Sequence, residues 1–407
     1  MKSQPLAGIR VLEIGAYISA PYAGVFLASL GAEVVKIEPP EGEAFRRDDE
    51  NRSPYFVQYN TGKKSVAINL KSKSGIGLVK SLLPRFDVLI ENMRPGKMTA
   101  LGLGESDCRA INPRLVYSSI SGFGSGGPWV DRPAYDTIGQ SIGGFYSIMN
   151  DAHPRRLTGT CIADLITGIT AAMGILAALL GRERSSDGEG SLVETSLIEA
   201  VSTLTVDALT QAYELGEDPV RSSRHPQAQN FCLETADGGS ITMHLSSSQK
   251  FWAALARVVG REDLISDPRY STYDARRVPQ HYGELVRIME EAFRKRPRGE
   301  WEEILAEADV PFAPVLTMHE FVAHPQTQWL ELMGPKVGGL PMLRSPWRFD
   351  GERPQRSDHA ALVGEHTREV LADVCSDADL EKLVASGEVR MAAIAGSNIQ
   401  VDGRQKR

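Results

Sequence analysis

The sequence predicts an α/β protein in which a large domain with a parallel sheet is followed by a smaller α+β domain. Three observations carry this prediction. The chain has 407 residues, and a single domain usually takes about 100 to 200. Short apolar strands alternate with helical segments through the first half, which is typical of parallel sheets. The second half changes to amphipathic helices separated by few strands.

The first half repeats a strand and helix pattern that predicts a large domain over residues 1–220. Gly31 directly follows the first apolar helix and is a good C-terminal stop. A long apolar helix should begin near Ala163. The expected strands lie at 8–14, 34–38, 87–92, 114–120 and 191–197, and the other helices at 21–30, 76–83, near Leu101 and Cys108, and up to about Leu215.

The second half predicts a small domain over residues 225–330. A polar, proline-bearing segment at 216–230 is the candidate linker. Residues 331–407 contain prolines and few long periodic runs, so we expect them to return and pack on the large domain. Within the small domain, the expected strands lie at 240–245 and 310–317, and the expected helices at 249–260, 282–295 and 300–308.

Composition limits the possible partners. The net charge of −7 argues against nucleic-acid or membrane-surface binding. Residues 1–100 nevertheless carry 14 Lys and Arg against 10 Asp and Glu, a balance of +4, so an anionic ligand should bind there. The 17-residue apolar run at 165–181 is interrupted by glycines and threonines and is interpreted as a core helix rather than a membrane span.

The cysteines and the N-terminus predict a cytoplasmic protein. Four scattered cysteines form no CxxC pair, so neither a disulfide framework nor a zinc site is expected. Residues 1–8 lack the apolar run of a signal peptide.

The first turn has the outline of a dinucleotide-binding unit but not its glycines. Only Gly15 matches the pattern G-x-G-x-x-G; Tyr17 and Pro21 follow, and Gly24 comes nine residues later. A bulky Tyr17 disfavours close approach of a pyrophosphate, so an NAD enzyme is a weak alternative to a plain strand–helix–strand unit.

Several ordered motifs are similar to those of one family. They include "GAYISAPYAGVFLASLGAEVVKIEPPEG", "YNTGKKSVAINLKS", "DVLIENMRPG", "NPRLVYSSISGFGSGGP" and "ADLITGITAAMGILAALLGRERSSDGEGSLVETSL". Together they resemble the class III coenzyme A transferases, a family that also contains carnitine and formyl-CoA transferases and α-methylacyl-CoA racemases. The resemblance runs from about Leu6 to about Asp373.

The resemblance implies a Rossmann-like large domain, a small domain and an interlocked homodimer. It also implies that CoA moves between an acyl-CoA and a small carboxylic acid, with no metal and no cofactor beyond CoA. The open alternatives are an α-methylacyl-CoA racemase or other epimerase and a CoA-binding protein without catalysis.

The resemblance implies that Asp164 is the nucleophile. A protein carboxylate would attack the thioester to form an anhydride and then an aspartyl-CoA thioester. Asp164 stands just ahead of the long apolar helix, where the helix dipole should keep it ionised. The alternative is a structural N-cap.

The resemblance places Tyr135 and Asp136 beside the nucleophile. Racemases carry a His-Asp pair there, so Tyr135 speaks against racemase activity. Alternatively, Tyr135 packs and Asp136 caps the helix that follows it. The glycine-rich stretch 122–127 is expected to form a backbone loop at the active site.

The residues matched to CoA binding come from three turns. Arg46 or Arg47 is also expected to reach the phosphates. The family's usual basic residue just after the second strand is Pro39 here, which leaves that contact open. The matched residues are Tyr17, Ile18, Ser19, Ile68 to Lys71, Asn92, Met93 and Arg94.

Overall fold

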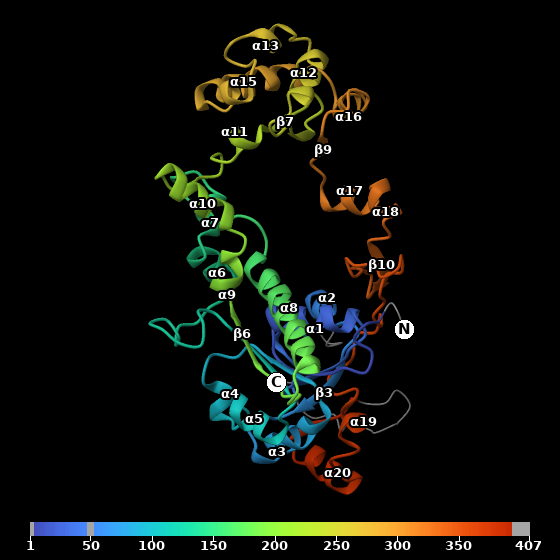
Figure 1. Cartoon of the computed structure of the whole chain (residues 1–407). Helices are drawn as coiled ribbons and strands as arrows, with labels where there is room; N and C mark the ends of the chain where they lie inside the picture. Colours follow the sequence, from blue (N-terminus) through green and yellow to red (C-terminus); the bar gives the residue numbers. More distant parts are fainter. Residues whose placement is uncertain (1–3, 47–52, 393–407) are drawn as a thin grey trace, which may run out of the picture. The chain divides into compact units, whose positions relative to one another are not determined.

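The computed structural model describes residues 4–46 and 53–392, which form two compact units (Figure 1). Of the described residues, the first unit takes in 4–46, 53–145, 159–205 and 330–392, and the second takes in 146–158 and 206–329. The boundary at 205 lies before the expected linker, so the helix at 206–215 belongs to the second unit. The expected C-terminal segment forms part of the first unit.

The first unit is built around a parallel sheet. Its elements in chain order are β1 (Arg10–Ile14), α1 (Ser19–Ser29), β2 (Glu33–Glu38), η1 (Ala44–Arg46), α2 (Pro54–Asn60), β3 (Lys64–Ile68), α3 (Lys73–Leu82), η2 (Leu83–Arg85), β4 (Val88–Glu91), α4 (Lys97–Ala100), α5 (Glu105–Ile111), β5 (Val116–Ser121), α6 (Asp136–Ile142), α8 (Ile162–Arg184), β6 (Leu192–Ser196), α9 (Leu197–Ser202), β10 (Met333–Val337), β11 (Leu340–Leu343), α19 (Thr367–Leu371), α20 (Asp377–Ala385) and β12 (Val389–Arg390).

The sheet has seven strands in the order β12-β3-β2-β1-β4-β5-β6. All neighbours pair in parallel except β12, which runs antiparallel to β3. Strand order therefore reverses between β1 and β4, the point at which open α/β sheets bind ligands. The predicted α/β fold class is confirmed.

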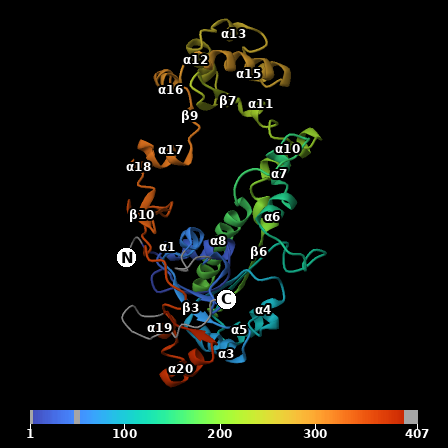
Figure 2. The ribbon, with the colours of Figure 1, turned by 180° about the vertical axis from the view of Figure 1, so that it is seen from behind.

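Helices cover both faces of this sheet (Figures 1 and 2). Successive strand residues point to opposite faces. Leu12 packs into the core shared with α3, α5, α19 and α20, whereas Val11 packs into the core shared with α1 and α8. Strands buried on both faces read as continuous apolar runs, which explains why they were visible in the sequence.

Two helices differ from their predicted bounds. Helix α1 begins at Ser19 rather than Pro21, because a proline in the first helical turn gives up an N–H that has no partner there anyway. The single helix expected up to Leu215 is two helices, α9 and α10 (Val206–Leu215).

Helix α8 is long and apolar enough to cross a membrane by length and composition. In the structure one side packs against α1, β5 and β6, with Ala171 and Ile175 fully buried. The opposite side exposes Met173 and Leu180. The predicted core helix thus has one buried and one exposed face.

The second unit is the smaller α+β part. Strands β7 (Asn230–Glu234), β8 (Ser240–His244) and β9 (Phe312–Pro314) form an antiparallel sheet, and Trp252, Phe293 and Trp301 lie in the core between it and the helices. Its elements are α10, α11 (His225–Ala228), β7 (Asn230–Glu234), β8 (Ser240–His244), α12 (Gln249–Val258), α13 (Asp263–Ser266), α14 (Tyr273–Arg276), α15 (Pro279–Phe293), α16 (Arg298–Glu307), β9 (Phe312–Pro314), α17 (Met318–Ala323) and α18 (Pro325–Trp329); α7 (Phe145–Ile148) spans the boundary between the units.

A buried charge cluster joins β1, β2 and the residue just before β3. Glu13 of β1 is fully buried; its Oε1 accepts a hydrogen bond from Lys36 at 3.0 Å and its Oε2 accepts one from Lys63 at 2.7 Å. Burial alone would raise the pKa of Glu13, but the two ammonium groups outweigh it and hold that pKa below its ordinary value. Burial also lowers the pKa of Lys63 to about 8.

The same lysines fix the first turn of the chain. Lys36 donates to the Gly15 carbonyl at 2.6 Å, and Lys63 donates to the Pro21 carbonyl at 2.8 Å. Gly24 allows α1 to approach, because a Cβ there would lie 2.2 Å from the Glu13 carboxylate. The backbone from Gly15 to Gly24 is therefore held by one buried carboxylate and its partners.

We expect Glu13→Gln to lower the free energy of unfolding by about 3–5 kcal/mol, because it leaves two buried ammonium groups without a counter-charge. Glu33→Gln is the matched control on β2. Glu33 pairs with Arg10 and Lys64 but is about one-third exposed, so its loss should cost at most about 1 kcal/mol. Chemical denaturation of both variants measures the difference, and equal costs would contradict the importance of the cluster.

Candidate active site

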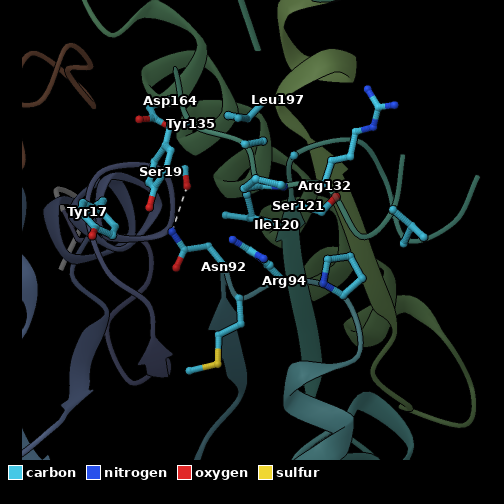
Figure 3. A pocket seen from close by; sticks show the side chains of 16 residues that line it. Tyr17, Ser19, Asn92, Arg94, Ile120, Ser121, Arg132, Tyr135, Asp164 and Leu197 are labelled. Atoms are coloured by element: carbon cyan, nitrogen blue, oxygen red, sulfur yellow. Dashed lines mark hydrogen bonds between the residues drawn. The ribbon is translucent and has the colours of Figure 1, made fainter. Parts of the chain in front are cut away.

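Two adjoining cavities lie where the parallel strands end in the first unit. The first, of about 180 Å³, is bordered by the residues that follow β1, β4 and β5 and by the start of α8. Figure 3 shows its lining. The residues are Tyr17, Ser19, Asn92, Met93, Arg94, Pro95, Ile120, Ser121, Gly122, Val130, Arg132, Pro133, Ala134, Tyr135, Asp164 and Leu197.

The second cavity, of about 690 Å³, lies beyond the ends of β1, β2 and β3. Its lining includes residues 37–44, residues 68–71 and Gly387. Tyr17, Asn92 and Met93 line both cavities. An elongated ligand can therefore lie over these three residues with one end in each cavity.

Asn92 ties the two turns at the reversal point together. Its Nδ2 donates to the Ala16 carbonyl at 2.9 Å and to the Ser19 hydroxyl at 3.1 Å, and its Oδ1 accepts from the Ala16 N–H at 3.1 Å. A Cβ on Gly15 would lie 2.9 Å from this Oδ1, so the turn requires glycine there. The wall between the cavities is therefore a rigid hydrogen-bonded unit.

Tyr17 stands on this wall in a left-handed backbone conformation, with φ of 64°. Its N–H donates to Glu43 at 3.2 Å, and its ring packs edge-on against Phe45 and Tyr135 at centroid distances of 5.4 and 5.7 Å. A non-glycine residue with positive φ is held there by its surroundings, and such residues often lie at functional sites.

Asp164 is the third residue of α8 and lies beside Tyr135 in the first cavity (Figure 3). Burial raises the pKa of its carboxyl to about 7, and the nearby Asp136 carboxylate adds to the shift. Desolvation and a like charge therefore oppose the helix dipole, which was expected to keep Asp164 ionised.

Asp136 caps the helix that carries Asp164. Its Oδ1 accepts from the Ala163 N–H at 2.8 Å and the Asp164 N–H at 3.3 Å. Gln140 donates to the other oxygen at 2.5 Å and to the Thr160 carbonyl at 2.8 Å. The cap of α8 therefore comes from the start of α6, and Asp136 does not belong to the cavity lining.

Two arginines bring positive charge to the first cavity. Arg94 follows β4, and Arg132 lies in the loop between β5 and α6, where its guanidinium stacks 4.1 Å from the centroid of the Trp129 ring. Within the described part of the chain, neither forms an ion pair with a carboxylate. Gly122 of the predicted loop lines the same cavity.

The structure brings together most of the residues singled out in the sequence. The first cavity contains Tyr17, Ser19, Asn92, Met93, Arg94, Tyr135 and Asp164, and the second contains Ile68 and Lys71. Ile18 is an exception, because its side chain packs against the cluster of Phe45, Phe56 and Tyr59.

Arg46 is held in a structural ion pair. It is buried, forms two 2.7 Å bonds to Glu38, donates to the Ala361 carbonyl at 2.9 Å and stacks on Phe56. The prediction that it reaches a phosphate is wrong, because its guanidinium is already used in the core. Arg47 lies outside the described residues.

Sequence reasoning missed Arg132, Ser121 and Leu197. Ser121 ends β5 and accepts the Gly124 N–H at 2.9 Å, and Leu197 begins α9 directly after β6. The positions of Ser121 and Leu197 at strand ends were the available signal, since the carboxyl ends of parallel strands meet at one edge of the sheet. Arg132 lies in the loop between β5 and α6 and offered no such signal.

The model of CoA-transferase family III matches residues 6–367. The chain is 33% identical over 362 residues to acetyl-CoA:oxalate CoA-transferase of Acetobacter aceti, covering 86% of this chain and 92% of that protein. It is 32% identical over 397 residues to succinate–glutarate CoA-transferase of Agrobacterium fabrum, covering 92% and 96%.

Solved structures agree with this assignment. A CAIB/BAIF family protein from Brucella suis superposes with a TM-score of 0.81 at 29% identity, covering 92% of this chain and all of that one. The chain therefore belongs to CoA-transferase family III and is a CoA-transferase.

Proposed function

We propose that this enzyme moves CoA from an acyl-CoA to a small free carboxylic acid through covalent intermediates on Asp164. The supporting observation is the composition of the first cavity. Among the described residues that line it, Asp164 is the one carboxyl group, and it adjoins a wall shared with the larger cavity. That arrangement suits a thioester at Asp164 with the rest of CoA in the second cavity.

The first half of the reaction splits the donor. An oxygen of the Asp164 carboxylate attacks the thioester carbonyl, the C–S bond breaks, and CoA leaves as a thiolate. The thiolate then attacks the Asp164 carbonyl of the resulting anhydride. The donor acid leaves as a carboxylate, and Asp164 holds CoA as a thioester.

The second half repeats these steps with the acceptor. The acceptor carboxylate attacks the aspartyl-CoA thioester and frees the CoA thiolate. That thiolate attacks the acceptor's acyl carbon in the new anhydride, which releases the product acyl-CoA and the Asp164 carboxylate. The thioesters broken and formed are similar in energy, so positioning supplies the acceleration.

Neighbouring residues have supporting roles. Asp136 and Gln140 act as positioning residues, because they hold the first turn of α8 through the bonds to Ala163 and Asp164. Arg94 and Arg132 supply charge that can attract a carboxylate acceptor.

The substrates are proposed from the relatives. The printed names of the curated relatives include acetyl-CoA and oxalate, and succinate and glutarate. We infer an acyl-CoA donor and a small carboxylate acceptor of this general kind.

A cytoplasmic location fits the four cysteines, which are all free thiols.

A racemase is the second candidate. Moving a proton between the two faces of an α-carbon requires an acid–base group on each face. Tyr135 stands where the racemases carry histidine. Asp164 is the single carboxyl group among the described residues that line the cavity, so a second carboxyl group for the opposite face is missing there. Exchange of an α-proton without acyl transfer would favour the racemase.

A homodimer is proposed from the family resemblance. Helix α10 of the second unit exposes Val206, Leu209 and Tyr213, at 61%, 58% and 86%. Such an apolar face fits burial against a second copy.

We expect Asp164→Ala to lower turnover by at least ~10³, because the covalent route is lost. Acyl-CoA binding should persist, since Asp136 rather than Asp164 caps α8. With wild type and donor alone, hydroxylamine should yield a hydroxamate on the peptide that contains Asp164. Asp207→Ala, in the first turn of α10, is the control and should keep full turnover. An active Asp164→Ala enzyme would rule the mechanism out.

The rate of donor cleavage in a single turnover should rise with pH through about 7. The pKa of Asp164 is raised to about 7, so protonation removes the nucleophile as the pH falls. Asp136→Asn removes the like charge and should move this rising limb of the pH–rate profile to lower pH. Glu183→Gln, ~30 Å further along α8, should leave the limb in place. A limb that stays unmoved in Asp136→Asn would contradict the assignment.

We expect a particle of about twice the 44.4 kDa chain mass in size-exclusion chromatography with light scattering. Leu209→Asp should weaken the dimer by placing a charge on the apolar face of α10. Gln211→Asp, on the same helix, is the control. A 44 kDa particle at micromolar concentration for wild type would overturn the proposed dimer.

A further inference from the structure

The outer end of the second cavity is built partly by the C-terminal segment. Strand β12 pairs with β3 so that Val389 lies opposite Ile68 and Arg390 opposite Ala67. The Asn69 N–H donates to the Glu388 carbonyl at 2.8 Å. Gly387 lines the cavity itself. The last strand is therefore fixed beside the turn that carries Lys71.

Arg390 brings a cation to this end of the cavity. Its Nη1 donates to the Pro40 carbonyl at 3.1 Å, and Pro40 is a lining residue. The side chain is exposed and forms no ion pair with any carboxylate among the described residues. An arginine has five N–H donors, so one bond to a carbonyl leaves donors for a ligand.

The cavity lining alone is a poor site for a phosphate. Its charged residues are Glu38, Glu41, Glu43 and Lys71. Glu38 is neutralised by its ion pair with Arg46, and the positive charge of the buried Lys36 acts on Glu43 and offsets its negative charge. Glu41, which is exposed, and Lys71 then cancel each other. Adding Arg390 makes the net charge at this end of the second cavity positive.

We propose that Arg390 binds a phosphate at the nucleotide end of CoA. This inference rests on the proposed function, which puts the thioester at Asp164 and the remainder of CoA in the second cavity. The nucleotide then lies among Pro40, Lys71 and Gly387, within reach of Arg390. Arginine suits this role, because its planar guanidinium binds a phosphate through two parallel hydrogen bonds.

Titration calorimetry on the full chain tests this with CoA and 3′-dephospho-CoA. Arg390→Met should weaken CoA binding about 5- to 30-fold, the scale of a charge-assisted contact discounted for exposure. If Arg390→Met loses affinity for CoA but not for 3′-dephospho-CoA, the contact is with the 3′-phosphate. If it loses affinity equally for both ligands, the contact is with the pyrophosphate. Either result supports the proposal.

Two further variants distinguish the loss of a phosphate contact from a folding defect. Glu41→Gln leaves Arg390 untouched, removes the competing negative charge and should tighten CoA binding about 2- to 5-fold. Lys382→Met removes an exposed cation from α20 in the same segment and should leave affinity unchanged. Wild-type affinity in Arg390→Met would overturn the proposal.

The test separates this inference from the mechanism. If Arg390 is wrongly assigned, CoA affinity stays unchanged while Asp164→Ala still abolishes turnover. If the covalent mechanism is wrong, Asp164→Ala turns over while the Arg390→Met affinity loss remains.

Discussion

The site depends on one buried carboxylate. Glu13 lies at the centre of the sheet and holds Lys36 and Lys63 around it, and these lysines bind the carbonyls of Gly15 and Pro21. A charge taken out of water must be fully paired, so this cluster permits one arrangement of the first turn. This first turn presents Tyr17 and Ser19 to the cavities. Asn92, which directly follows β4, bonds to the turn and connects it to the end of that strand.

Asp136 affects the start of α8 in two ways. The Asp136 carboxylate satisfies two backbone N–H groups that the first turn of a helix leaves without partners. It also adds to the rise in the pKa of Asp164, which burial causes in the main. A carboxyl with pKa near neutrality suits covalent CoA transfer, because the group must attack as an anion and later depart as one. The cap Asp136 and the proposed nucleophile Asp164 are therefore coupled through one short stretch of backbone.

The C-terminal segment completes both the sheet and its core. Strand β12 forms the edge next to β3, and Leu371 and Leu380 pack with the side chains of α3 and β1. The same segment supplies Gly387 to the second cavity and Arg390 to its rim. The larger cavity therefore requires residues from both ends of the chain, so its shape depends on the docking of the last described residues.

The sequence by itself determined the alternation of strands and helices, the fold class and the positions of Tyr17, Asn92 and Asp164. Apolar runs mark strands buried on both faces, and the residues after parallel strands must meet at one edge of the sheet. The family resemblance added the chemistry of Asp164. Only the tertiary structure decided that Arg46 is held by Glu38, that Asp136 caps a helix 27 residues further on, and that Arg390 reaches Pro40. These pairings join segments far apart in the chain, and no local periodicity records which charges the packing brings together.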